Sequence, residues 1–137
     1  MSNKISGSCL CGSVSYESSA EPLFQGFCQC SDCNKAGCGH YAALGLPEDT
    51  VMIRGEYKTF GKTGGSGKKI YRHFCGNCGG IVFDKGEAFP GITIVNASLL
   101  DDPSLFQPSH VVYTRSALPW DHVDPSLTKF EALPPME

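Results

Sequence analysis

The sequence lacks the long apolar runs that membrane-spanning helices and secretory signal peptides require. No stretch approaches the roughly 18 consecutive apolar residues of a membrane span, and the N-terminal residues MSNKISGS contain no apolar segment of the signal-peptide type. We therefore expect a cytoplasmic protein with no membrane partner. Thiols stay reduced in that compartment, so clustered cysteines are expected to bind a metal or take part in catalysis rather than to form disulfides.

Positive charge is not in excess either. The chain carries 11 Lys and Arg residues against 14 Asp and Glu residues, which gives a formal net charge of −3 at pH 7. Proteins bind the phosphate backbone of nucleic acids through clustered Lys and Arg side chains. The charge balance therefore predicts that the chain has no nucleic-acid partner.

Long helical periodicity is also absent. Short β-branched, aromatic or other apolar runs alternate with turns, in keeping with 16 glycines and 9 prolines among 137 residues. Two short helical turns are expected, one after Cys33 and one around residues 101–106, where two aspartates precede Pro103. The pattern predicts an all-β fold in a single domain covering residues 1–137. The predicted strands are residues 14–16, 23–27, 41–46, 51–53, 57–60, 70–74, 81–83, 92–95 and 111–113.

The segment GKTGGSGKK, residues 61–69, has the composition of a phosphate-binding loop but not its spacing. Lys62 stands where the first glycine of that motif belongs, and Lys69 stands where its Ser or Thr belongs. Because strand-like runs flank the segment, we interpret it as a flexible hairpin tip. The alternative, in which Lys62, Lys68 and Lys69 contact an anionic substrate, stays open.

The chain is rich in cysteine, with 8 residues that cluster along the sequence. The groups are Cys9-x-Cys11, Cys28-x-Cys30-x-x-Cys33 with Cys38 beyond it, and Cys75-x-x-Cys78. Glycines beside these groups permit the tight turns that bring two sulfurs to one metal ion. Three such groups in a short chain favour zinc over disulfides or unliganded structural thiols.

The number of ligands suggests how the cysteines are shared between two zinc ions. A structural zinc ion takes four tetrahedral ligands, which two distant pairs can supply, whereas a catalytic zinc ion takes three protein ligands and keeps one position open. The predicted closed site is Cys9, Cys11, Cys75 and Cys78, and the predicted open site is Cys28, Cys30 and Cys33. Spacing alone leaves open whether Cys38 closes the second site.

Five segments of the chain carry a more specific resemblance through their order and spacing. They are GSCLCGSVSYE (7–17), CQCSDCNKA (28–36), FCGNCGG (74–80), VNASLLDDPS (95–104) and HVVYTRSALPW (110–120). Together they resemble the glutathione-dependent formaldehyde-activating enzyme family, which also includes centromere protein V. The resemblance implies an all-β, β-tent fold with two zinc ions. It implies a structural zinc bound by Cys9, Cys11, Cys75 and Cys78, and a catalytic zinc bound by Cys28, Cys30 and Cys33.

The resemblance also implies a reaction. Named members of the family condense formaldehyde with glutathione to S-(hydroxymethyl)glutathione, as zinc-dependent carbon–sulfur lyases. The expected partners are therefore glutathione or another small thiol, together with an aldehyde. An open zinc position suits this chemistry because zinc favours the thiolate form of a thiol, which is the nucleophile. The alternative function is a non-catalytic, zinc-stabilised binding module of the same fold, and the fourth ligand of the second zinc distinguishes the two.

Three residues near the C-terminus carry further predictions. His110 is expected to cap or pack rather than to catalyse. His122, with Asp121 and Asp124, is expected to belong to a solvated turn, with a proton-relay cluster as the alternative. Trp120, the single tryptophan, is expected to lie in the core rather than to cover a cavity.

Overall fold

The computed structural model describes residues 4–134, which form short strands, one α-helix and four 3-10 turns. The helix is α1 (Ser31–Ala36), and the 3-10 turns are η1 (Glu48–Thr50), η2 (Ala97–Leu99), η3 (Pro103–Leu105) and η4 (Thr114–Ser116). No helix in this part of the chain is long and apolar enough to cross a membrane. The strands are β1 (Ile5–Ser8), β2 (Ser15–Ser18), β3 (Phe24–Cys28), β4 (Tyr41–Pro47), β5 (Met52–Arg54), β6 (Tyr57–Thr63), β7 (Lys69–Cys75), β8 (Ile81–Gly86), β9 (Ile92–Asn96), β10 (His110–Val112) and β11 (Thr128–Lys129).

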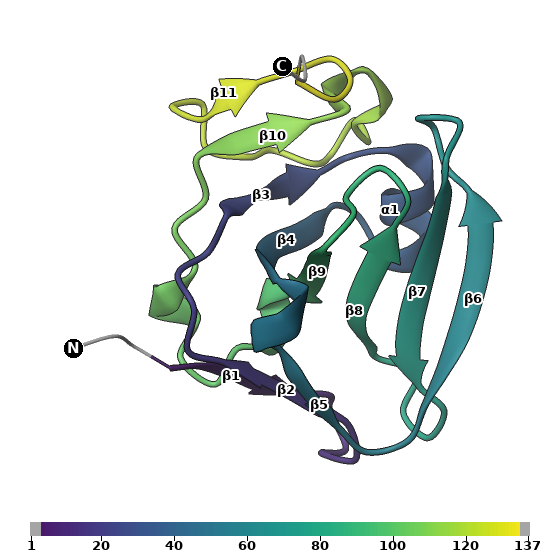
Figure 1. Cartoon of the computed structure of the whole chain (residues 1–137). Coiled ribbons are helices and arrows are strands. Elements are labelled where there is room, and N and C mark those ends of the chain that lie inside the picture. Colours follow the sequence, from purple (N-terminus) through teal and green to yellow (C-terminus); the bar gives the residue numbers. More distant parts are fainter. Residues whose placement is uncertain (1–3, 135–137) are drawn as a thin grey trace.

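The strands form two sheets. A three-stranded antiparallel sheet has the order β1-β2-β5, and an eight-stranded sheet has the order β11-β10-β3-β4-β9-β8-β7-β6. Most of the large sheet is antiparallel, but β10 runs parallel to both β3 and β11. Figure 1 shows the large sheet curving from β11 and β10 at the top to β6 at the right, with the small sheet below it. The predicted all-β fold is confirmed.

The predicted strands and turns correspond closely to the observed elements. Every predicted run overlaps a strand, and the structure adds β1 and β11, which were not predicted. The first helical turn begins at Ser31, before Cys33, so Cys33 lies inside α1 rather than ahead of it. The second is η3, where the Asp102 side chain accepts a hydrogen bond from the Ser104 backbone NH at 3.1 Å, as a helix-capping residue does.

The two faces of the large sheet have different neighbours, because side chains alternate along each strand. In β4, Ala42, Leu44 and Leu46 pack into the main core, whereas Tyr41 and Ala43 line a cavity on the opposite face. The cavity is also lined by alternate residues of β3, β7, β8, β9 and β10, among them Gly26 and Cys28, Ile70 and Arg72, Asp84 and Gly86, Ile92 and Ile94, and His110 and Val112. The main core consists of Ile5, Cys9, Val14, Tyr16, Ala42, Leu44, Leu46, Cys75, Val82, Phe83, Val95, Ala97 and Leu100.

The glycine-rich segment joins β6 to β7 as a hairpin, as predicted, but its tip is shorter than expected. The strand pairing extends to Thr63 and Lys69, so only residues 64–68 form the tip. The tip is closed by a hydrogen bond from the Gly64 NH to the Lys68 carbonyl at 2.9 Å. Lys62 forms an ion pair with Asp32 of α1, which holds the hairpin beside the helix.

Candidate metal centres and an adjoining cavity

The first group of cysteines lies where the two sheets approach each other. Cys9 and Cys11 belong to the turn between β1 and β2, Cys75 ends β7, and Cys78 lies in the turn before β8. Their four sulfurs lie within 4.8 Å of one another. The Cys9–Cys11 and Cys11–Cys75 sulfur distances are 3.7 and 3.6 Å. Tetrahedral zinc with Zn–S bonds of about 2.3 Å has sulfur–sulfur distances of about 3.8 Å, so these thiols fit zinc closely.

Backbone turns and burial fix this four-cysteine cluster. The Cys75 sulfur accepts a hydrogen bond from the Asn77 NH at 3.3 Å, and the Cys9 sulfur accepts one from the Val14 NH at 3.3 Å. Such NH groups stabilise negative charge on sulfur. Gly79 has a φ of 78°, which a glycine adopts without strain and which turns the chain from Cys78 into β8. Because Cys9 and Cys75 are also members of the main core, this cluster and the core are built together.

The second group of cysteines lies at the junction of β3 and α1. Cys28 ends β3, Cys30 is the N-cap residue of α1, and Cys33 lies in its first turn. The Cys30 sulfur accepts a hydrogen bond from the Cys33 backbone NH at 3.2 Å. All three sulfurs lie within 4.8 Å of one another, and all three residues line the cavity. This three-cysteine cluster therefore has the donor atoms and spacing for a thiolate metal site with one side facing the cavity.

The pKa shifts within the three-cysteine cluster indicate that a bound cation would stabilise it. Hydrogen bonds from the neighbouring sulfurs, Cys30 first, and burial raise the pKa of Cys28. The hydrogen bond with Cys28 lowers the pKa of Cys30. Three sulfurs at such short range do not all ionise readily unless a cation is present, because neighbouring thiolates repel one another. A divalent cation that replaces the thiol protons relieves that repulsion, which is the behaviour of a metal site.

A buried ion pair supports the same cluster. Arg72 of β7 donates a hydrogen bond to the Cys33 sulfur at 3.3 Å and another to Asp84 of β8 at 2.9 Å. Burial raises the pKa of Asp84 to about 7, and Arg72 acts against that shift. Neither residue was predicted from the sequence. The available signal was strand alternation, which places Arg72 on the same face of the predicted strand 70–74 as Ile70.

Cys38 lies apart from both clusters. Helix α1 ends at Ala36, and Cys38 is an exposed residue in the left-handed region, with a φ of 60°. The Gly39 NH donates to the Asn34 carbonyl at 2.9 Å, so the chain reverses direction immediately after the helix. The groups of sulfurs close enough to share a metal ion do not include Cys38 in the described part of the chain.

The cavity beside the three-cysteine cluster has a volume of about 610 Å³. Pockets of this size accommodate small-molecule ligands. Its walls are the cavity face of the large sheet, helix α1, the β6–β7 hairpin tip, the loop between β8 and β9, and the C-terminal segment. The sheet contributes Phe24, Gly26, Cys28, Tyr41, Ala43, Ile70, Arg72, Asp84, Gly86, Ile92, Ile94, His110 and Val112, and the C-terminal segment contributes Thr128, Phe130, Leu133 and Pro134.

His110 is a titratable residue of this cavity wall. It pairs with Gly26 across β10 and β3, and Gly26 precedes Cys28 by two residues on the same face. A Cβ atom on Gly26 would lie 2.6 Å from His110 Nε2, so only glycine leaves room for the imidazole ring. Burial lowers the pKa of His110. His110 packs against the strand, as predicted, and in addition faces the cavity.

Asp121 pairs with His40 rather than with His122, the histidine of the predicted proton-relay alternative. Asp121 lies 2.9 Å from His40 Nδ1 and accepts a hydrogen bond from Gln29 at 3.1 Å. This contact attaches the C-terminal segment to the residues around α1. Trp120 is 71% exposed and does not line the cavity, so its predicted core position is wrong.

The fold and the cysteine geometry define a small all-β protein with thiol groups arranged for metal binding. A family model described as glutathione-dependent formaldehyde-activating enzyme matches residues 4–116, and the chain belongs to this family. A search of curated proteins finds no match. The crystal structure of a Rhodobacter sphaeroides protein aligns with a TM-score of 0.59 over 91% of this chain and 98% of that chain, at 20% identity. That likeness supports the fold.

Proposed function

We propose that the chain is a carbon–sulfur lyase that joins a thiol to an aldehyde at a zinc ion held by Cys28, Cys30 and Cys33. Glutathione and formaldehyde, named in the family description, are the first substrates to test. A second zinc ion, held by Cys9, Cys11, Cys75 and Cys78, has a structural role. The observation that carries the proposal is that the three-cysteine cluster supplies only three sulfurs and faces a cavity, whereas the other cluster supplies four sulfurs and has Cys9 and Cys75 in the main core.

The reaction needs no further reactant. The thiol loses its proton, the sulfur electron pair forms a bond to the carbonyl carbon, and the carbonyl π pair moves to oxygen, which takes up a proton. The product is an S-(hydroxyalkyl) thioether, and the reverse reaction breaks the same carbon–sulfur bond. Zinc, when bound, supplies the positive charge that favours thiolate at neutral pH.

The residues around the cluster have separate tasks in this scheme. Arg72 keeps a positive charge beside the Cys33 sulfur, which offsets part of the negative charge of three thiolates. His110 is the proton carrier. Because burial lowers its pKa, its imidazole is neutral at pH 7 and can accept the proton of the thiol before returning one to the oxygen. The apolar cavity wall excludes water from the thiolate.

The proposal is tested by exchange NMR with glutathione and carbon-13 formaldehyde, which measures the rate of adduct formation above the spontaneous rate. We expect the wild-type protein to accelerate the exchange, Cys30→Ser to abolish the acceleration, and His110→Gln to reduce it by about 100-fold, as expected for loss of a proton carrier. Cys38→Ser is the matched control and should behave as wild type. Equal rates for Cys30→Ser and wild type would remove the enzyme interpretation and favour a binding module.

A further inference from the structure

The cavity next to the three-cysteine cluster is larger and more apolar than formaldehyde requires. Formaldehyde has one carbon atom, whereas the cavity volume is about 610 Å³. Aromatic and aliphatic side chains from strands and loops far apart in the sequence form much of its wall. The apolar wall includes Phe24, Phe89, Ile92, Ile94 and Phe130.

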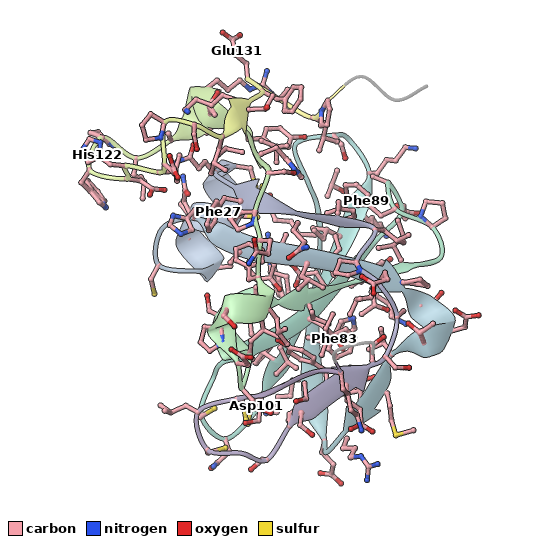
Figure 2. All side chains as sticks on the ribbon, turned by 90° about the vertical axis from the view of Figure 1, so that its left-hand side faces the viewer. Phe27, Phe83, Phe89, Asp101, His122 and Glu131 are labelled. Carbon is pink, nitrogen blue, oxygen red and sulfur yellow. The ribbon has the colours of Figure 1, made fainter. Side chains whose placement is uncertain are left out.

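The apolar wall is built by specific packing. A Cβ atom on Gly45 would lie 2.3 Å from the Phe24 ring, so the ring lies directly over a glycine of the neighbouring strand. The Phe24 and Phe89 rings are 5.9 Å apart, within the range of favourable aromatic contacts. In Figure 2, Phe89 lies above Phe83 of the main core, and Phe24 and Phe89 pack in a second apolar cluster around Tyr41 and Ile94. This wall is therefore separate from the main core.

One wall of the cavity comes from residues beyond the family match. The match ends at residue 116, whereas Thr128, Phe130, Leu133 and Pro134 line the cavity. The segment is held in place by backbone hydrogen bonds from the Phe130 NH to the Val111 carbonyl at 2.9 Å and from the Thr114 NH to the Phe130 carbonyl at 3.1 Å. A wall outside the matched residues can influence which substrate this chain takes without any change to its cysteine clusters.

The charged groups of the cavity are distributed unevenly. Arg72 and Asp84 neutralise each other within the sheet, and Asp32 is paired with Lys62. Lys68 at the hairpin tip and Lys69 at the start of β7 are exposed and line the cavity. A ligand that carries anionic groups at one end and an apolar group at the other matches this distribution, since charged groups stay near water and the apolar group is buried.

We propose that the aldehyde substrate carries an apolar substituent, an aryl or medium-length alkyl group, which binds against Phe24, Phe89 and Phe130. This inference rests on the proposed function and specifies its substrate class. The aldehyde carbon lies beside the three-cysteine cluster, where it receives the thiol sulfur, and the anionic groups of a thiol such as glutathione lie toward Lys68 and Lys69.

The test uses stable analogues of the adduct. S-methyl-, S-butyl- and S-hexylglutathione keep the thiol part constant and extend the carbon that corresponds to the aldehyde. Isothermal titration of the zinc-loaded protein measures their affinities. Each buried methylene should strengthen binding about fourfold, so S-hexylglutathione should bind at least about 100-fold more tightly than S-methylglutathione. Equal affinities across the series would overturn the inference.

Matched variants locate the binding site of the alkyl group. Phe89→Ala and Phe130→Ala, on separate elements, should each weaken S-hexylglutathione by about tenfold or more and leave S-methylglutathione within about twofold. Phe60→Ala is the control, because Phe60 is 59% exposed and does not line the cavity. A rising series that neither cavity variant changes would place the alkyl group elsewhere and overturn the inference.

A parallel measurement separates this inference from the proposed function. Cobalt-substituted protein reports on thiol binding through its sulfur-to-metal charge-transfer bands. A spectrum that responds to glutathione, together with a flat alkyl series, would refute the apolar substrate and keep the thiol chemistry. A rising series with a spectrum that does not respond would keep the apolar ligand class and refute the thiol chemistry.

Discussion

The two cysteine clusters use the same side chain in different surroundings. The four-cysteine cluster lies between the two sheets, and two of its members are less than 5% exposed and belong to the main core. The three-cysteine cluster lies on the opposite face of the large sheet, beside a cavity and a buried Arg72–Asp84 pair. A site with four sulfurs fills the tetrahedral coordination of a zinc ion and leaves no position for substrate. A site with three sulfurs beside a cavity leaves one coordination position of the zinc ion open to substrate.

Strand β7 connects these two regions. It contributes Cys75 to the first cluster at one end and Arg72 to the second near its middle, and it begins at the hairpin tip that borders the cavity. The effect of a substitution at one cluster on metal binding at the other can therefore be measured. The comparison predicts that the four-cysteine cluster controls stability and that the three-cysteine cluster controls ligand binding.

The largest expected effect is that of Cys75→Ser. A structural zinc site contributes on the order of 10 kcal/mol of binding free energy, which is comparable to the whole stability of a domain, about 5–15 kcal/mol. We expect the variant to be unfolded or insoluble, as measured by circular dichroism and by yield of soluble protein. Cys30→Ser should remain folded with one zinc ion fewer. If Cys30→Ser unfolds as completely as Cys75→Ser, both clusters are structural and the comparison fails.

The second largest effect is expected from a chelator, which should remove the two zinc ions one after the other. The protein as purified should contain two zinc ions per chain by elemental analysis. With excess chelator, the zinc ion beside the cavity should leave first, because ligands reach it from solvent, while far-ultraviolet circular dichroism stays unchanged. Loss of the second zinc ion should coincide with unfolding. Simultaneous loss of both ions would show that the clusters are equally protected.

Arg72→Met should have an intermediate effect. Removing one partner of a buried ion pair costs about 3–5 kcal/mol, here because Asp84 is left buried without its cation and the Cys33 sulfur loses a donor. Urea unfolding measures the loss. Arg72→Met/Asp84→Asn should regain part of it, and a double variant as unstable as the single one would exclude the unpaired carboxylate as the cause.

The same variant has a pH signature. Burial already raises the pKa of Asp84 to about 7, and loss of Arg72 should raise it further. A carboxyl group whose pKa is higher in the folded state lowers stability as pH rises from the unfolded pKa to the folded one. Between pH 7 and 8.5 the variant should therefore lose more unfolding free energy than wild type. If unfolding free energy falls in parallel with pH in the variant and in wild type, Arg72 does not control the pKa of Asp84.

The sequence predicted the strands and the grouping of cysteines because both depend on short-range patterns. Apolar runs bounded by turns located strands such as 41–46, and C-x-C and C-x-x-C spacing located the sulfur pairs. The cavity wall was not predicted, since it joins Phe24, Phe89 and Phe130, which the chain brings together only through the sheet order. Trp120 was misplaced for a similar reason: it follows a proline in a segment whose position is set by the contact of Asp121 with His40.

The smallest expected effect is that of Cys38→Ser, and it tests whether the three-cysteine cluster is open. Cys38 is exposed, in a left-handed turn after α1, and does not lie within 4.8 Å of the three sulfurs as a group. The variant should keep two zinc ions and a stability within about 0.5 kcal/mol of wild type, as surface substitutions do. Its cobalt spectrum should still respond to glutathione. If the wild-type cobalt site instead has four thiolates, ignores added thiol and loses one thiolate in Cys38→Ser, then the chain turns back to close the site. The two clusters would then be alike, and the protein would be a zinc-stabilised binding module rather than an enzyme of thiol chemistry.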